Sequence, residues 1–169
     1  MLFFTYDEFK KFISVEDNIL YKTMYETLYY CGLRRGELRG LTWNDIDFKN
    51  SYLSVNKNVV ATRGDEDKSY MVTTPKTKSS VRNIPISKVL LDDLKELYRV
   101  SNNHYGFNNS WYVFGDTEPI TNGKIRCRKN KNCELAEVKQ IRIHDFRHSC
   151  ASLLINSGAT INVVAKYLG

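Results

Sequence analysis

Two histidines, an arginine and an aspartate lie within five positions of the stretch "IRIHDFRHSC", residues 141–150. An apolar run follows directly, so these groups stand at the start of a predicted helix. A solvated surface would scatter such groups and a core would exclude them, whereas a helix N-terminus favours negative charge. The stretch therefore predicts an anionic partner that is presented in a fixed place.

A second candidate pair lies in "CGLRRGELRGLTW", residues 31–43. Arg34 and Glu37 are three positions apart, and in a helical turn that spacing puts both side chains on the same side. The carboxylate can then hold the guanidinium rigid while the remaining donors face outward. An ordinary surface ion pair beside a helix end is the alternative, and this stretch alone leaves both interpretations open.

Two lysines stand in a third stretch, "TPKTKSSVRNIPI", residues 74–86. The β-prone runs "YMVTT" and "VRNIPI" flank Lys76 and Lys78, which places both lysines at a predicted hairpin tip. From there an ammonium group either reaches into a groove or remains in water.

The formal net charge of +6 is concentrated in two segments. Residues 71–90 hold four basic residues and no acid, and residues 121–150 hold eight basic residues and three acids. These segments together carry +9, so the rest of the chain sums to −3. Such clustering favours a nucleic-acid partner, because neutralising phosphates releases condensed counterions. A solvated basic face would have the same composition.

The spacing of apolar residues predicts helices at both ends of the chain. Thr5 and Glu8 have capping-box spacing, so a short helix is expected from about residue 6. An apolar stripe predicts a second helix over about 17–31, with Gly32 as a left-handed C-cap. Further helices are predicted from Ser87 onward and near 121–136, 145–157 and 161–168.

Short β-prone runs between the second and third predicted helices indicate a small antiparallel sheet. The chain of 169 residues is 42% apolar, which is enough to build a sizeable core. No internal repeat or linker divides it. The sequence therefore predicts one domain over residues 1–169, of the α+β class and mainly helical.

Composition also excludes several kinds of protein. No stretch approaches the roughly 18 apolar residues of a membrane helix, and the N-terminus becomes charged too soon for a signal peptide. An intracellular protein with no membrane partner is expected. No C-x-x-C pair occurs, so neither a zinc site nor a disulfide framework is expected. The four cysteines are Cys31, Cys127, Cys133 and Cys150.

In this order, "CGLRRGEL", "PKTKSSVRNIPI" and "RIHDFRHSCASLLINSGATINVVAKYLG" resemble the catalytic domain of the tyrosine recombinases, particularly the integrases of phages and conjugative transposons. The resemblance covers essentially the whole chain. It implies a mainly helical domain with a small antiparallel sheet inserted after the first arginine, in agreement with the elements above. It also implies a location in the cytoplasm of a bacterial host, associated with the nucleoid.

The resemblance implies a catalytic role for four residues and a supporting role for a fifth. Arg34 would be the first catalytic arginine, with Glu37 as its acidic companion, and Arg147 would be the second. His144 would be the histidine three positions before Arg147, and Lys76 the hairpin lysine that acts as a general acid.

Other nearby side chains are expected to lie outside the catalytic set. Lys78 is the alternative to Lys76, since the hairpin of the family varies in length. His148 is expected to be a packing residue or one that supports its catalytic neighbours. Surface positions or DNA-backbone contacts are expected for Arg35, Arg39 and Arg82.

In this family a tyrosine hydroxyl attacks a DNA phosphodiester, giving a 3′-phosphotyrosyl link and a free 5′-hydroxyl, as in type IB topoisomerases. Neither a metal nor a nucleotide cofactor takes part. Arginine suits such a site because its planar fork donates bidentately and keeps its charge, whereas lysine can give up a proton. The implied function is site-specific DNA recombination and integration for a phage or other mobile element.

The sequence departs from the family pattern at its end. After "KYLG" the family usually continues with a second histidine and, on a later helix, the nucleophilic tyrosine. We therefore expect residues 1–169 to be a catalytic domain that lacks the nucleophile, with a DNA-binding domain before residue 1. The partner is double-stranded DNA. The full-length protein is expected to form a tetramer on DNA, and residues 1–169 alone an inactive monomer.

Two other functions are compatible with parts of the sequence. "GATINVVAKYLG" is similar to the first half of a helix-turn-helix, with Thr160 as N-cap, so a DNA-binding transcriptional regulator is the main alternative. A regulator has no need of Arg34 and Glu37 together with a distant His144 and Arg147. An RNA-binding or scaffold domain leaves the same residues unexplained.

Overall fold

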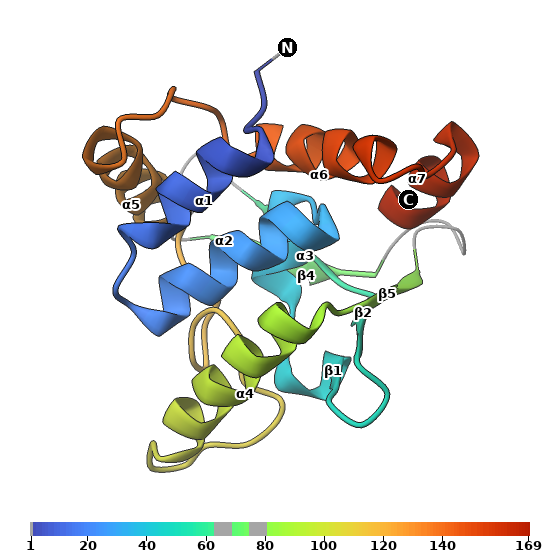
Figure 1. Ribbon diagram of the computed structural model, residues 1–169. Coiled ribbons are helices and arrows are strands. Elements are labelled where there is room, and N and C mark those ends of the chain that lie inside the picture. The colour runs from blue at the N-terminus through green and yellow to red at the C-terminus, as the bar shows by residue number, and fades with distance from the viewer. Residues whose placement is uncertain (1, 63–68, 75–80) are drawn as a thin grey trace.

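Helix α2 (Ile19–Cys31) forms the centre of the molecule, and its residues 23–29 are all buried. The computed structural model describes residues 2–62, 69–74 and 81–169. Figure 1 shows α2 lying between α6 on one side and α4 on the other, and both helices pack against it. Gly32 ends α2 with a φ of 61°, as the sequence predicts.

Side-chain caps stand at the starts of several helices, and those at Thr5 and Thr160 are the predicted ones. The capping box of Thr5 and Glu8 is formed, with the Thr5 N–H donating to Glu8 Oε2 at 2.8 Å. Ser87, Thr121 and Thr160 each accept a backbone N–H at the start of a helix. The remaining helices are α1 (Tyr6–Ser14), α3 (Arg35–Gly40), α4 (Lys88–Asn102), α5 (Asn122–Leu135), α6 (Asp145–Asn156) and α7 (Ile161–Leu168).

Aromatic rings fix the start of α6 against α1 and α2. Phe146 of α6 lies edge-on to Phe4 and stacks with Tyr25 of α2, at ring-centroid distances of 5.6 and 5.8 Å. Phe12 of α1 meets Tyr25 edge-on at 5.1 Å. Offset and edge-on ring pairs of this kind stabilise a core beyond the area that they bury. Since Phe146 directly precedes Arg147, this packing sets where the Arg147 side chain emerges.

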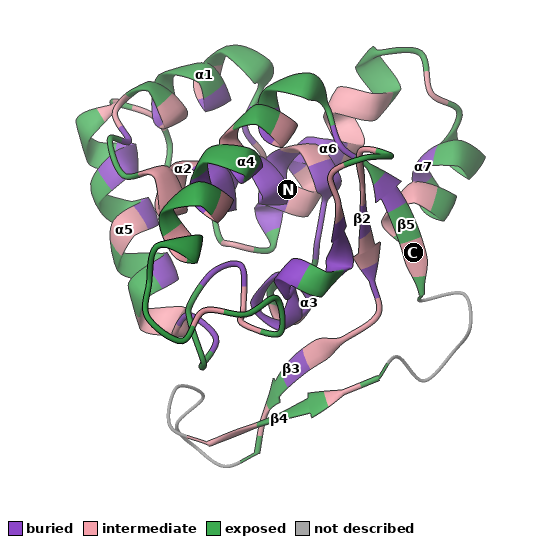
Figure 2. Ribbon diagram, turned by 90° about the horizontal axis from the view of Figure 1, so that it is seen from below, coloured by how far each residue is buried: buried purple, intermediate pink, exposed green. Residues whose placement is uncertain are grey.

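The strands form two small antiparallel sheets. One has three strands in the order β1 (Ile46–Asp47), β2 (Tyr52–Val55) and β5 (Arg82–Pro85). The other pairs β3 (Asn58–Ala61) with β4 (Tyr70–Thr73), and Figure 2 shows this pair extending away from the helical body. The predicted small antiparallel sheet is confirmed, but the predicted hairpin between "YMVTT" and "VRNIPI" is wrong, because β4 and β5 pair with different strands.

Close backbone packing holds β3 against α3. A Cβ built on Gly36 would lie 2.7 Å from the carbonyl oxygen of Val59 and would also collide with Asn58 Oδ1. Only glycine allows so close an approach. The contact places the N-terminal part of α3, and with it Arg34 and Glu37, at the base of the β3–β4 pair.

Membrane-spanning segments and disulfide bonds are the two features that the composition argues against. Among the described residues, no helix is long and apolar enough to cross a membrane. The four cysteines are free thiols, of which Cys31, Cys133 and Cys150 are buried and Cys127 is exposed.

A buried carboxylate joins the segment before α2 to α5. The Glu16 side chain is 0% exposed and accepts hydrogen bonds from Arg128 Nε at 2.8 Å and Asn132 Nδ2 at 2.7 Å. The backbone N–H of Asn18 donates to it at 3.0 Å. Burial opposes ionisation of Glu16, but the bonds from Arg128 and Asn132 outweigh burial and lower its pKa.

We predict that Glu16→Gln lowers the free energy of unfolding by about 3 kcal/mol at pH 7, because one partner of a buried ion pair is lost. Glu96→Gln is the matched control, since its pair with Arg99 is exposed, and it should cost less than about 1 kcal/mol. Urea denaturation of both variants measures the difference. Equal losses would show that the buried Glu16–Arg128 pair stabilises the fold no more than the exposed Glu96–Arg99 pair does.

The same pair predicts a pH dependence. The pKa of Glu16 is lower in the folded than in the unfolded chain, so its stabilisation is complete above the unfolded value of about 4.3. It is lost as the pH falls through the folded pKa. The difference between wild type and Glu16→Gln should therefore shrink below about pH 4.

Candidate active site

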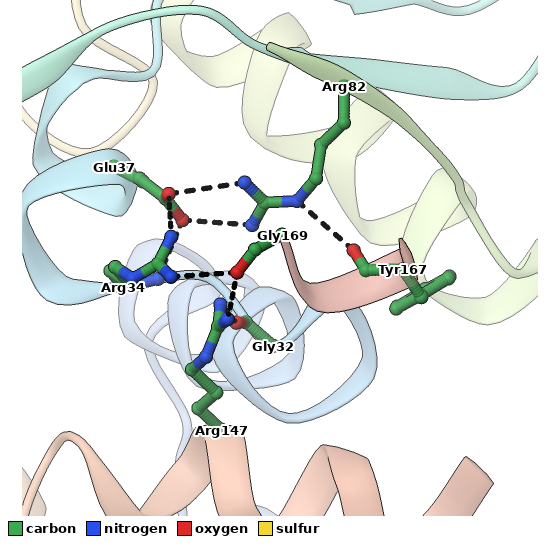
Figure 3. Close-up of polar contacts among 7 residues, drawn as sticks. All are labelled: Gly32, Arg34, Glu37, Arg82, Arg147, Tyr167 and Gly169. Carbon is green, nitrogen blue, oxygen red and sulfur yellow. Dashed lines mark hydrogen bonds and ion pairs between the residues drawn. The ribbon is translucent and has the colours of Figure 1, made fainter. Parts of the chain in front are cut away.

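The Glu37 carboxylate is the centre of a cluster of arginines. Its side chain is 7% exposed and lies at the start of α3. Oε1 accepts Nη1 of Arg34 at 2.9 Å, and Oε2 accepts the backbone N–H of Arg34 at 2.9 Å. Arg82 Nη1 and Nη2 donate to Oε1 and Oε2 at 3.1 and 3.0 Å. The predicted Arg34–Glu37 pair is therefore present, and Glu37 holds a second arginine as well (Figure 3).

Arg34 and Arg147 converge on one oxygen atom. Nη2 of Arg34 lies 2.7 Å and Nη2 of Arg147 lies 2.8 Å from the backbone oxygen of Gly169. Nη1 of Arg147 donates to the Gly32 carbonyl oxygen at 3.0 Å. Figure 3 shows the two guanidinium groups meeting at this oxygen, Arg34 from the left and Arg147 from below. The end of α2 and the start of α6 thus bring together two arginines that are 113 positions apart.

Arg82 and Arg39 are buried, and the prediction of surface positions for them is wrong. The Arg82 side chain is 7% exposed, and its Nε donates to the Tyr167 carbonyl oxygen at 3.1 Å. Arg39 is 3% exposed, and its Nε donates to the Ile120 carbonyl oxygen at 2.8 Å. Buried carbonyl and carboxylate acceptors from distant segments satisfy both guanidinium groups. Arg35 is exposed, as expected.

The cluster carries an excess of positive charge, with three guanidinium groups around one carboxylate. Burial opposes ionisation of Glu37, but hydrogen bonds from Arg82 and Arg34 outweigh burial and lower its pKa. Burial, followed by the neighbouring Arg34 charge, lowers the pKa of Arg147 to about 10. Arg147 stays charged at neutral pH even so. Such a cluster favours binding of an anion.

His144 directly precedes α6 and is exposed, and its side chain makes no capping hydrogen bond. Its ring lies perpendicular to that of His148, with the centroids 5.2 Å apart. Partial burial, followed by the charges of His148 and Arg147, lowers the pKa of His144 below its ordinary value. The imidazole is therefore mainly neutral at pH 7, a form that can accept or donate a hydrogen bond.

Asp145 has a structural role in the charged stretch 141–150. It is 1% exposed and accepts the backbone N–H of Arg142 at 2.8 Å and the Arg142 Nη2 at 2.8 Å. The hydrogen bond from the Arg142 side chain is the main cause of the lowered pKa of Asp145. This local pair fixes the turn that presents His144.

An open groove of about 1480 Å³ runs past Arg34 and His144. Its walls come from α3, β3, α5 and the segment before α6. Glu134 is the acid among the described lining residues, whereas the basic ones are Arg34, Arg35, Arg39, Arg126, Lys129 and Arg142.

Internal contacts already take up part of the charge of residues 121–150. Arg128 pairs with Glu16, Arg142 pairs with Asp145, and Lys129 donates to the Ile141 carbonyl oxygen at 2.6 Å. The basic surface is therefore smaller than the count of basic residues indicates.

The two candidate lysines, Lys76 and Lys78, lie outside the described residues. The Tyr167 hydroxyl donates to the Tyr30 carbonyl oxygen at 3.0 Å, so it points away from the arginine cluster. Burial raises the pKa of this hydroxyl. Among the described residues, no three His, Cys, Asp or Glu side chains gather to hold a metal ion.

Comparison with known proteins finds relatives along the whole chain. The model of the Phage integrase family matches residues 3–169. The ICEBs1 integrase of Bacillus subtilis (strain 168) is 38% identical over 177 residues, which span 100% of this chain and 47% of that protein. A tyrosine recombinase XerC-like protein of Caldanaerobacter subterraneus subsp. tengcongensis is 28% identical over 183 residues, 98% of this chain and 46% of that protein. The chain spans about half the length of these curated relatives.

Solved structures share the fold. The integrase of transposon Tn1549, in complex with transposon right end DNA, superposes with a TM-score of 0.77 at 23% identity, covering 99% of this chain and 57% of that chain. The XerA recombinase gives a TM-score of 0.78 at 20% identity, covering 100% and 56%. The fold is that of the catalytic domains of tyrosine recombinases. Because a family model matches nearly every residue and a relative is 38% identical along the full chain, the chain belongs to the phage integrase family of tyrosine recombinases.

Proposed function

We propose that this chain is the catalytic part of an integrase that carries out site-specific DNA recombination for a mobile element. The observation that carries the proposal is the convergence of Arg34 and Arg147 on a single oxygen atom, at 2.7 and 2.8 Å. A phosphodiester presents non-bridging oxygens that bear negative charge, and arginine forks bind them bidentately. In this chain the oxygen is the backbone oxygen of Gly169, and an oxygen of the scissile phosphate takes its place in the proposed complex with DNA.

In the proposed reaction a tyrosine oxygen forms a bond to phosphorus, and the bond from phosphorus to the 5′-oxygen breaks. The leaving 5′-oxygen takes a proton, for which Lys76 is the proposed donor. Arg34 and Arg147 stabilise the charge that develops on the phosphoryl oxygens, where preorganised donors contribute most. Glu37 positions Arg34. His144, mainly neutral at pH 7, donates to the phosphate or takes up the proton that the tyrosine hydroxyl loses.

The groove beside Arg34 is the proposed path of the DNA backbone. Exposed Arg126 and Arg35 line it, together with the buried Lys129. The Tn1549 integrase, which has the same fold, was solved in complex with DNA. A DNA-binding domain before residue 1, a tyrosine beyond Gly169 and a tetramer on DNA remain predictions. The regulator alternative gains no support from the family match or from these relatives.

We predict that residues 1–169 bind duplex DNA weakly and with a strong dependence on salt. If about four to six phosphates are neutralised, a plot of log affinity against log salt should slope by roughly −4 to −5. Arg126→Gln should reduce the slope by about 1, whereas Arg99→Gln on α4 should leave it unchanged. Fluorescence anisotropy over a salt series measures both. A flat salt dependence would contradict a DNA-facing groove.

We predict that Arg34→Lys and Arg147→Lys each slow DNA cleavage by about 10²- to 10³-fold in a protein that includes the nucleophilic tyrosine. A lysine supplies a point charge but not the fork that reaches two acceptors. DNA affinity should change much less. Arg99→Lys is the control for a surface arginine. Single-turnover cleavage of nicked DNA measures the rates, and near-normal rates for both variants would make the arginines structural.

We predict that residues 1–169 alone form no covalent adduct with a nicked suicide substrate. The arginines lower the barrier only for a nucleophile held in line with the phosphate, and the Tyr167 hydroxyl is bonded to Tyr30 instead. A chain extended through the expected tyrosine should give a denaturant-resistant protein–DNA band. An adduct with residues 1–169, mapped to one of the eleven tyrosines, would overturn the proposed place of the nucleophile.

A further inference from the structure

Arg82 is the buried arginine of the cluster, and each of its three side-chain nitrogens donates to a protein acceptor. It reaches the cluster from β5, and both of its terminal nitrogens donate to Glu37, at 3.1 and 3.0 Å. Its Nε donates to the Tyr167 carbonyl oxygen. These three bonds direct its donors to protein acceptors, so a role in binding the phosphate directly is not indicated (Figure 3).

The bonds of Arg82 limit what Glu37 can offer to Arg34. Each Glu37 oxygen already accepts one nitrogen of Arg82, and Oε2 also accepts the backbone N–H of Arg34. The Arg34 side chain therefore donates to Glu37 through Nη1 alone. Its Nη2 points away from Glu37, to the backbone oxygen of Gly169, which Arg147 also contacts.

An arginine and a carboxylate that are left to each other prefer two parallel hydrogen bonds. Without Arg82, the Oε2 of Glu37 would lose a strong donor, and Arg34 could turn Nη2 toward it. That rotation would withdraw Nη2 from the point of convergence with Arg147. Even a small misplacement of a catalytic group is costly to a reaction rate.

We infer that Arg82 is a positioning residue: by occupying both oxygens of Glu37, it keeps the Nη2 of Arg34 directed at the phosphate position shared with Arg147. The inference rests on the proposed function, because it names a residue that prepares the site for that reaction. Arg82 also ties the end of α7 to β5 through Tyr167 and so steadies the backbone beside the cluster.

The charges around Glu37 add a second consequence. The charged groups that face it are Arg34 before α3, Arg82 on β5 and Arg147 on α6. Burial alone would raise the pKa of Glu37, and the hydrogen bond from Arg82 leads the interactions that lower it. Loss of Arg82 should therefore raise the pKa of Glu37. The acid limb of the cleavage–pH profile should then move to higher pH, since a protonated Glu37 no longer holds Arg34.

The first test is Arg82→Gln in the protein that includes the nucleophilic tyrosine. Single-turnover cleavage should fall by about 10- to 100-fold, while DNA affinity should change by less than about threefold. The matched control is Arg99→Gln, which removes another bidentate Arg–Glu pair, with Glu96 on α4 at 3.0 and 2.7 Å. The control should leave the cleavage rate unchanged. Wild-type cleavage by Arg82→Gln would overturn the inference.

A double-mutant cycle separates positioning from a general loss of structure. In a Glu37→Gln background, Arg82→Gln should change the cleavage rate by less than about threefold, because the oxygen charge that Arg82 occupies is already gone. Equal losses in both backgrounds would mean that Arg82 acts independently of Glu37. Arg82→Lys keeps the charge but donates from a single nitrogen, so it should be intermediate in rate even if Arg82→Gln folds poorly.

A titration of Glu37 needs no recombination activity, so it tests the role of Arg82 separately from the proposed function. The Glu37 carboxyl resonance, followed by ¹³C NMR, should titrate at higher pH in Arg82→Gln than in the wild type. An unchanged titration would overturn the inference even if the wild-type protein recombines DNA. A wild-type protein that never cleaves DNA would instead overturn the proposed function, and the titration would still decide whether Arg82 controls Glu37.

Discussion

The structure of the site depends on the neutralisation of one buried carboxylate. Glu37 can remain ionised at 7% exposure only because Arg34 and Arg82 donate to both of its oxygens. In return it holds guanidinium groups close together that would otherwise repel one another. The same repulsion acts on Arg147, whose pKa is lowered by burial and then by the Arg34 charge. The result is a small site that has a net positive charge and whose guanidinium donors are held in fixed positions.

The packing of α2 against α6, directly beside the site, holds the arginines in place. The buried α2 ends at Gly32, whose carbonyl oxygen accepts a hydrogen bond from Arg147. A side chain at Gly32 would meet Cys150 Sγ of α6 at 3.0 Å, so glycine lets the two helices approach each other. The rings around Phe146 fix α6 from the other side. Packing between segments that are far apart in the sequence thereby determines where Arg34 and Arg147 meet.

Features that depend on nearby residues could be predicted from the sequence. The capping box at Thr5, the left-handed Gly32 and the Arg34–Glu37 pair all follow from spacings of a few positions, and all are present. The family resemblance placed Arg147 with Arg34, which spacing alone could not do.

Features that depend on tertiary contacts could not be predicted in the same way. Arg39 and Arg82 look like surface residues in the sequence, because arginines are rarely buried, and nothing local shows that Ile120 and Glu37 supply acceptors. Arg82 does lie in the stretch "PKTKSSVRNIPI", which is one of the three that carry the family resemblance, and this was the available signal. The strand partners of β4 and β5 were also missed, since β-prone runs do not specify their neighbours.

The most direct test of the account is to remove the charge from the phosphate instead of from the protein. In a DNA substrate with a methylphosphonate at the cleavage site, one charged oxygen becomes a neutral methyl group. If Arg147 acts on that charge, then Arg147→Ala should cost at least about 100-fold in cleavage rate on the natural substrate and less than about tenfold on the methylphosphonate. Equal losses on both substrates would contradict the claim that the arginine cluster stabilises the phosphate.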